Sequence, residues 1–293
     1  MVTAGQREGE SGMPADSPET PPSSSRAGRD LPAAIGVGLV LGAAVVLSLL
    51  MVRYLFIGIV AAAVAVATVE LAGALRRGAG IRVSLFPVLA GGQAMVWLSW
   101  PFGLRGVLLA FVVTVLGCMV WRFRDGVDGY LRDVTASVFT SAYIPLFAAF
   151  AAMLVLPEDG AFRALCFMIG VVVSDTAGYA CGVLFGKHPM APRISPKKSW
   201  EGFAGSLVFG MLAGVLSVLL LLGGQWWHGL LFGAALACSA TVGDLMESLI
   251  KRDLGIKDMG NMLPGHGGLM DRMDSLLPSA AVAWMMLFLL VPA

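Results

Sequence analysis

The residues best suited to chemistry lie in one stretch of 27 residues, Ser248 to Asp274, between two strongly apolar segments. The stretch contains His266, one of only three histidines, in a chain of which 13% is charged. It also gathers eight charged side chains of both signs: Lys251, Arg252, Asp253, Lys257, Asp258, Asp271, Arg272 and Asp274. Charged groups among apolar neighbours cost free energy unless they are paired with opposite charges or bind a ligand or metal. The cluster therefore predicts a functional site.

Carboxylates recur at helical spacing at both ends of this stretch. Glu247 and Ser248 follow Asp244 by three and four residues, and Asp274 follows Asp271 by three, so each set can share one helical face. Carboxylates beside cations suit Mg²⁺, which takes a few oxygen ligands together with substrate phosphates. We expect Asp244, Asp271 and Asp274 to hold this metal. Surface ion pairs are the alternative interpretation.

A glycine-rich turn, Pro-Gly-His-Gly-Gly, lies between those two ends. Its glycines, including Gly267 and Gly268, allow the backbone to pass close to a ligand. His266 is able to donate a hydrogen bond to phosphate or to transfer a proton. A lone histidine is more often structural, but one flanked by glycines has little core to satisfy. We therefore expect the turn to contact a substrate.

A second polar patch lies upstream, in residues 186–203. Its Ser-Pro pair resembles a helix start, and helix N-terminal amides beside cations favour phosphate. An ordinary basic loop at a membrane surface is the alternative. The hydroxyls and the carboxylate among the cations favour substrate binding, by Ser195, Lys197, Lys198, Ser199 and Glu201.

A lone carboxylate, Asp175, lies within the apolar segment before this patch. It is about 13 Å from the end of that segment at ~1.5 Å per residue, and such a buried acid is a site candidate by default. Small residues recur at every fourth position around it and predict a face for close helix packing: Gly170, Ser174, Gly178, Gly182 and Gly186.

The elements that position these patches are membrane helices. Of the 293 residues, 57% are hydrophobic, whereas an average soluble domain carries about a quarter charged residues. This composition predicts an all-α polytopic integral membrane protein. The net charge of +1 and the lack of a long basic run give no indication of a nucleic-acid partner.

Segment lengths and charged breaks predict about nine transmembrane helices. The stretch Ile35–Leu75 would be about 60 Å long as one helix, twice the ~30 Å hydrocarbon thickness. It therefore forms two spans with a turn near Arg53. The other seven predicted spans are Leu85–Trp100, Gly106–Trp121, Thr135–Leu156, Ala164–Leu184, Phe203–Leu222, Trp227–Leu249 and Leu276–Pro292.

The basic residues predict a cytoplasmic N-terminus. With that orientation only Arg53, Arg105 and Arg163 face outward, which leaves 17 of the 20 basic residues on the cytoplasmic side. Both polar patches then face the cytoplasm, where nucleotides are found. We divide the chain into a disordered cytoplasmic tail (1–31), N-terminal transmembrane helices that act as a scaffold (32–160) and a catalytic transmembrane region (161–293).

The polar stretch resembles the signature of the phosphatidate cytidylyltransferases, or CDP-diacylglycerol synthases. The resemblance covers roughly Gly170 to Ser275, and the first half of the chain matches mainly in hydropathy. Ser199 stands where threonine is common, and the long polar tail is not a family feature. The signature is carried by Ser248, Lys251, Arg252, Lys257, Asp258, Gly260, Pro264, His266, Gly267, Gly268, Asp271, Arg272 and Asp274.

The resemblance implies a dimeric, nine-span enzyme that transfers CMP from CTP to phosphatidic acid, giving CDP-diacylglycerol and pyrophosphate. It also implies a requirement for Mg²⁺ and a second, monovalent cation such as K⁺ near the aspartates. The Ala-, Gly- and Val-rich spans fit a bacterial plasma membrane. The expected catalytic residues are Asp244, Lys251, Arg252, Lys257, His266, Asp271 and Arg272; substrate contacts are expected from Asp175, Ser195, Lys197, Lys198, Ser199, Glu201, Ser248, Gly267 and Gly268.

Three other functions use similar residues. A CTP-dependent polyprenol or phytol kinase would share both patches but release CDP, and the complete signature argues against it. A CDP-alcohol phosphotransferase would need a motif that neither Asp125-Gly126 nor Asp128-Gly129 continues. A transporter could use Asp175 for coupling, but the charges are concentrated on one side rather than at the midplane of paired repeats.

Overall fold

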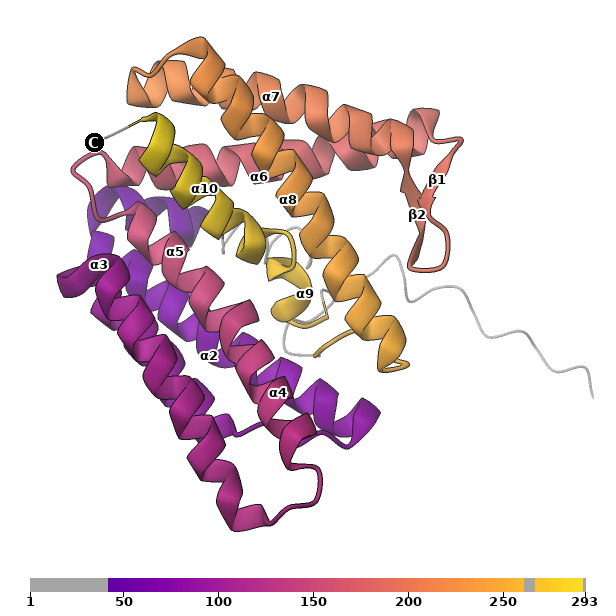
Figure 1. The fold of residues 1–293 in the computed structure, drawn as a ribbon. Helices are drawn as coiled ribbons and strands as arrows, with labels where there is room; N and C mark the ends of the chain where they lie inside the picture. The colour runs from indigo at the N-terminus through magenta and orange to yellow at the C-terminus, as the bar shows by residue number, and fades with distance from the viewer. Residues whose placement is uncertain (1–41, 261–266, 292–293) are drawn as a thin grey trace, which may run out of the picture.

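The computed structural model describes residues 42–260 and 267–291, and these are almost entirely helical (Figure 1). Among them, seven helical segments are long and apolar enough to cross a membrane. This confirms the predicted all-α integral membrane protein. The segments are Arg53–Ala79, Leu85–Asp125, Tyr130–Leu154, Gly160–Phe185, Trp200–Leu222, Trp226–Asp253 and Met270–Leu290, and a shorter apolar helix, Gly42–Met51, precedes them.

The predicted turn near Arg53 is confirmed. Val52, between Gly42–Met51 and helix α2 (Arg53–Ala79), is extended, with φ −148° and ψ 103°. Arg53 then donates hydrogen bonds to the carbonyls of Pro157 and Glu158, in the loop before α6. The start of α2 is thereby tied to a distant turn of the chain.

Helix α3 (Leu85–Trp121) consists of two arms that fold back on each other. Gly103 separates them with a non-helical backbone, φ 54° and ψ −141°, a conformation that favours glycine. The rings of Phe86 and Trp121 stack at 5.1 Å, and a Cβ atom at Gly91 would overlap Thr114. The arms correspond to the two short spans predicted separately here, because Pro101 and Gly103 break the helix where the turn is needed.

The rest of the first half is one bent helical segment after a short 3-10 turn, η1 (Arg122–Asp125). It consists of α4 (Tyr130–Ser141), the π-helical turn η2 (Ala142–Leu146) and α5 (Phe147–Leu154). Arg122 and Asp133, both almost fully buried, form an ion pair of 2.9 Å at its start. This pair anchors the 3-10 turn to α4.

The second half is built on α6 (Gly160–Phe185), α7 (Trp200–Leu222) and α8 (Trp226–Asp253), which Figure 1 shows packed side by side. Their backbones touch through glycines: a Cβ at Gly233 would overlap the carbonyl of Gly210. The predicted small-residue face of α6 is confirmed as a packing face, because Gly178 lies against Ser206 of α7 and Gly170 against Leu236 of α8.

A β-hairpin connects α6 to α7, with strands β1 (Pro189–Ala191) and β2 (Ser195–Ser199). The predicted helix start at Ser195 is therefore wrong. The Ser195–Ser199 segment pairs with β1 instead, and α7 begins only at Trp200. Ser199 is extended and caps the helix by accepting a 3.1 Å hydrogen bond from the amide of Gly202, the usual role of an N-cap serine.

The chain ends with a short helix, α9 (Met270–Met273), followed by α10 (Leu276–Leu290). Helix α10 contacts α5 on one side and α8 and α6 on the other, so it joins the two halves (Figure 1). Where α9 meets α10, a Cβ atom at Gly243 of α8 would overlap the carbonyl of Asp274. This close approach places Asp244 beside Asp274. The predicted tail, His266 and Pro292 lie outside the described residues.

Candidate active site

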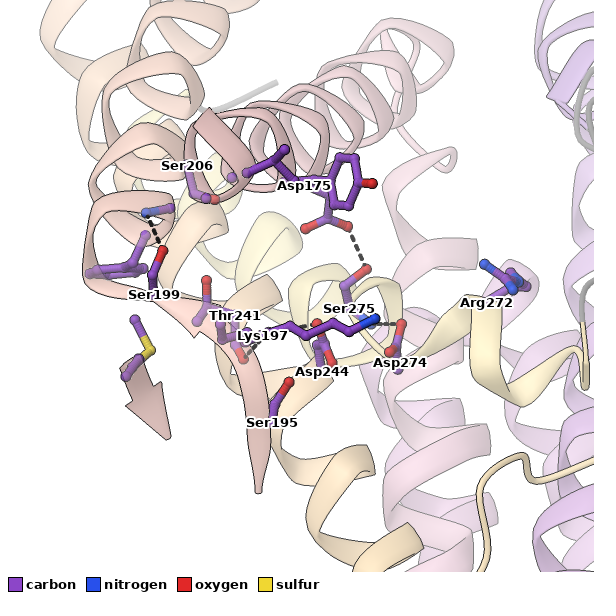
Figure 2. A pocket seen from close by; sticks show the side chains of 18 residues that line it. Asp175, Ser195, Lys197, Ser199, Ser206, Thr241, Asp244, Arg272, Asp274 and Ser275 are labelled. Atoms are coloured by element: carbon purple, nitrogen blue, oxygen red, sulfur yellow. Dashed lines mark hydrogen bonds and ion pairs between the residues drawn. The ribbon is translucent and has the colours of Figure 1, made fainter. Parts of the chain in front are cut away.

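A cavity of about 770 Å³ lies where α6, α7, α8, the β-hairpin and the α9–α10 junction meet (Figure 2). Both polar patches contribute to it. Eight of the predicted site residues line it together: Asp175, Ser195, Lys197, Lys198, Ser199, Asp244, Arg272 and Asp274. Apolar side chains, among them Tyr179, Val183 and Phe203, complete its wall.

Three carboxylates reach this cavity from different elements. Asp175 comes from α6, Asp244 from α8 and Asp274 from the α9–α10 junction. Ser275 links two of them, because its hydroxyl donates to Asp175 Oδ2 at 2.8 Å and its amide donates to Asp274 Oδ1 at 2.7 Å. Lys198 Nζ lies 2.7 Å from Asp244 Oδ2. The cavity wall therefore presents carboxylate oxygens, which are suitable metal ligands, beside a lysine side chain.

Ser275 is a site residue that the sequence analysis missed. Its hydroxyl donates a hydrogen bond to the Asp175 carboxylate, 100 positions away in the chain. The available signal in the sequence was its place directly after Asp274, where a hydroxyl ends the polar stretch.

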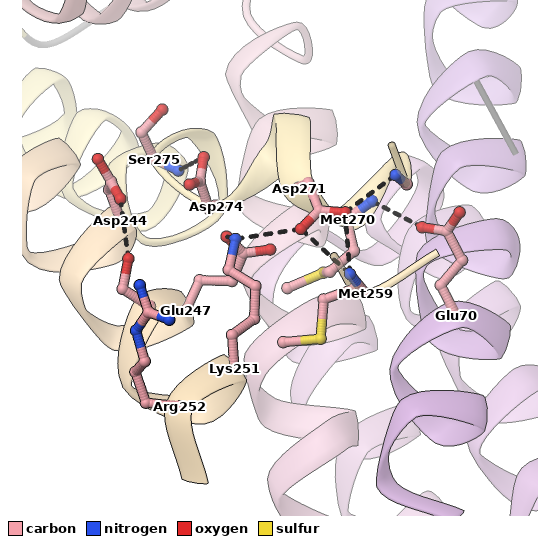
Figure 3. Close-up of polar contacts among 12 residues, drawn as sticks. Glu70, Asp244, Glu247, Lys251, Arg252, Met259, Met270, Asp271, Asp274 and Ser275 are labelled. Atoms are coloured by element: carbon pink, nitrogen blue, oxygen red, sulfur yellow. Dashed lines mark hydrogen bonds and ion pairs between the residues drawn. The ribbon is translucent and has the colours of Figure 1, made fainter. Parts of the chain in front are cut away.

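Asp271 and Lys251 lie outside the cavity lining, in a second group that we call the buried cluster: Glu247, Lys251 and Asp271 (Figure 3). Lys251 Nζ contacts Glu247 Oε2 at 2.6 Å and Asp271 Oδ1 at 3.1 Å. The Asp271 carboxylate also accepts hydrogen bonds from the amides of Met259, at 3.0 Å, and Gly268, at 2.9 Å. The Asp271 side chain is only 7% exposed. It joins Met259 to Gly268, two described residues of the segment between α8 and α9, which we call the loop.

The remaining predicted residues have other partners or are exposed. Arg252 Nε donates to the carbonyl of Ile194 at 3.3 Å and so ties α8 to the hairpin. Ser248 donates to Asp244 Oδ1 at 3.4 Å. Glu201 accepts the amides of Lys187 and His188 at the base of the hairpin. Lys257 is exposed, and His266 lies outside the described residues.

Gly267 and Gly268 lie beside the buried cluster. Gly267 adopts φ 79°, which favours glycine. A Cβ atom at Gly268 would lie 2.9 Å from Asp271 Oδ2 and 2.7 Å from the amide nitrogen of Gly260. The structure thus gives both glycines a role in forming the tight loop.

The donor set fits Mg²⁺. No group of three or more His, Cys, Asp or Glu side chains in residues 42–260 and 267–291 forms a metal site by itself. Mg²⁺, however, is usually held by one or two carboxylates, with substrate phosphates and water completing its shell. Asp244, which is 40% exposed, and Asp274 present such carboxylates to the cavity.

The sequence profile of the cytidylyltransferase family matches residues 32–290. The chain belongs to this family. It is 52% identical to the phosphatidate cytidylyltransferase of Mycobacterium leprae over 90% of both chains. It is also 52% identical to that of Mycobacterium tuberculosis strain H37Rv, over 91% of this chain and 85% of the relative. The corresponding protein of Brucella suis is 33% identical over 62% of this chain and 66% of its own length. The resemblance found in the sequence is thereby confirmed.

Proposed function

We propose that this protein is a phosphatidate cytidylyltransferase. It transfers CMP from CTP to phosphatidic acid and produces CDP-diacylglycerol and pyrophosphate in phospholipid biosynthesis. The names of relatives that are 52% identical over 90% of the chain support this activity. The structural observation that carries it is the cavity in which Lys197, Lys198 and Arg272 lie with three carboxylates, next to apolar side chains suited to a lipid.

The reaction joins two anions, so charge neutralisation is its main requirement. A phosphate oxygen of phosphatidic acid attacks the α-phosphorus of CTP, and the bond from that phosphorus to the β-phosphate oxygen breaks. Phosphomonoesters have a second pKa near ~6 and are largely dianionic at neutral pH, so no strong general base is needed. Lys197, Lys198 and Arg272 are the cavity cations that we assign to the phosphates.

Asp244 and Asp274 are the carboxylates that would hold Mg²⁺ in the cavity. Asp271, the third predicted ligand, lies outside the cavity lining, and its carboxylate contacts Lys251 and the amides of Met259 and Gly268. When bound, the ion supplies positive charge to the triphosphate and the departing pyrophosphate. Asp175, held by Ser275 at the same wall, is the proposed contact for a second, monovalent cation such as K⁺. The buried cluster holds α9, which carries Asp271, in place through the contact with Lys251.

We further infer nine membrane crossings, a cytoplasmic N-terminus and an active site that faces the cytoplasm of a bacterial plasma membrane. The eighth crossing comes from counting the two arms of α3 separately, and the ninth from the helix Gly42–Met51. The distribution of basic residues supports the orientation. Labelling of single cysteines at positions 105 and 193 by an impermeant reagent in intact cells tests it. Only position 105 should react. We also propose a homodimer, which mass measurement in detergent would test.

The deciding experiment is an assay of purified protein in detergent with CTP. Pyrophosphate and a CDP-lipid should appear only when both phosphatidic acid and Mg²⁺ are added. Release of CDP with another lipid acceptor would instead identify a kinase. Failure of all nucleotide chemistry with a well-folded sample would overturn the proposal.

A further inference from the structure

Glu70 connects the first half of the protein to the loop before α9. It lies on α2, and its Oε2 accepts a 2.8 Å hydrogen bond from the amide of Met270, 200 positions later in the chain (Figure 3). Met270 is the first residue of α9, the helix that carries Asp271 and Arg272. A single carboxylate of the N-terminal scaffold thus contacts the start of the element that leads into the cavity.

The loop is packed directly on this carboxylate. A Cβ atom at Gly260 would overlap Glu70 Oε1, and one at Gly268 would lie 2.7 Å from Glu70 Oε2. Only glycine therefore lets the backbone come this close on both sides. Glu70 Oε1 is buried and has no hydrogen-bond partner among the described residues. A buried acceptor of this kind is costly, so packing alone does not account for a carboxylate here.

A second side chain of α2 holds the same loop. Arg77 donates to the carbonyl of Met259 at 3.1 Å, while the amide of Met259 donates to Asp271. The loop is therefore held on one side by α2, through Glu70 and Arg77, and on the other by the buried cluster, through Asp271. Glu70 thus accepts the amide of Met270, and Asp271 accepts the amides of Met259 and Gly268.

We propose that Glu70 is a positioning residue for cytidylyl transfer. It sets the place of α9 by holding the Met270 amide, and α9 in turn sets the directions of Arg272 and Asp274 toward the cavity. The inference rests on the proposed function, since it concerns the same site. Glu70 itself does not line the cavity, so it acts through the residues that it holds.

The test compares kcat and KM for three variants of the full-length protein in detergent. Glu70→Ala removes the acceptor, and kcat should fall on the order of 100-fold, the usual cost of misplacing a reacting group by about 1 Å. KM for CTP should change less than about threefold, because Lys197 and Lys198 remain in place. Glu70→Gln retains a carbonyl oxygen for the Met270 amide and should recover most of the lost kcat.

Gln93→Ala is the matched control. Gln93 also joins two helices by a side-chain hydrogen bond, donating to the carbonyl of Ala61 on α2 at 2.9 Å. Its other hydrogen-bond partner among the described residues is Trp97, on its own helix. This variant should lose thermal stability to a similar extent and keep its kcat. Equal losses of kcat in Gln93→Ala and Glu70→Ala would overturn the proposal, as would a normal kcat in folded Glu70→Ala.

A double-mutant cycle with Gly260 tests the contact itself. Gly260→Ala alone should lower kcat, because its methyl group would displace the Glu70 carboxylate. The same change made in Glu70→Ala should cost little more, so that the two effects are strongly non-additive. Additive effects would contradict the contact. An inactive wild-type protein would refute the proposed function instead, and the two failures are therefore distinguishable.

Discussion

The two groups of carboxylates in this protein have different surroundings, although the sequence spaces them alike. Asp244, on the cavity wall, is 40% exposed and contacts Lys198. Asp271, in the buried cluster, is 7% exposed and accepts hydrogen bonds from Lys251 and two backbone amides. The first carboxylate is available to a ligand, whereas the second holds the loop. The comparison indicates that acids from one polar region of the chain can divide ligand access and loop support between them.

Replacement of the cavity carboxylate should have the largest effect. We expect Asp244→Asn to lower kcat on the order of 1,000-fold, because the change removes the charge that we assign to Mg²⁺ and leaves Lys198 without its ion-pair partner. The unfolding temperature should stay close to that of the wild type. Steady-state pyrophosphate release and thermal unfolding measure the two quantities. Asp159→Asn, at a carboxylate paired with Arg163 away from the cavity, is the control and should remain active.

Replacement of the buried carboxylate should affect folding as well as turnover. Asp271→Asn removes one of the two carboxylates that face Lys251. Because Glu247 still contacts this amine, the loss of stability should be smaller than the ~3–5 kcal/mol of a fully broken buried pair. We expect an unfolding temperature at least about 5 °C lower and a kcat reduced on the order of 100-fold. If the variant loses activity at an unchanged unfolding temperature, Asp271 serves as a metal ligand rather than as support for the loop.

Removal of a cavity cation should act mainly on binding. Lys197→Ala should raise KM for CTP about tenfold, equivalent to ~1.4 kcal/mol, with a smaller change in kcat. Lys187→Ala removes a cation from the same polar patch but outside the cavity lining, and its kinetics should match the wild type. Equal effects of the two variants would mean that the patch attracts substrate only through its overall charge.

The arginine on α8 should matter least. Arg252 is exposed and donates to the hairpin carbonyl of Ile194 at 3.3 Å, so Arg252→Ala should reduce kcat less than about threefold. Arg272→Ala, at a residue that lines the cavity, should reduce it more than tenfold. Reversal of this order would return Arg252 to the catalytic role expected from the sequence. Parallel measurements of kcat and KM for both variants decide it.

Much of the fold was predictable because apolar length and charged breaks determine membrane helices locally. The break before Arg53 and the turn at Gly103 fall where length and helix-breaking residues required them. The joining of the two polar patches also followed, since both lie at helix ends. The strand Ser195–Ser199 did not follow, because its conformation depends on pairing with β1.

The direction of individual side chains was less predictable. Spacing places Asp271 and Asp274 on one helical face, but α9 is only four residues long and ends at Met273. The two carboxylates therefore have different partners. Glu70 contacts Met270 across 200 positions, a distance over which no local pattern operates. Its one available signal was a charge within an otherwise apolar helix.

The glycine contacts between α7 and α8 affect how the protein tolerates mutation. These helices meet backbone to backbone at Gly210 and Gly233, and again at Gly214 and Gly229. At Gly214, Gly229 and Gly233 even a methyl group would overlap the other helix. A random screen for loss of function should therefore return these three glycines as readily as the aspartates. A map drawn from such hits alone would locate the active site at the helix crossing, away from the cavity that we propose as the active site.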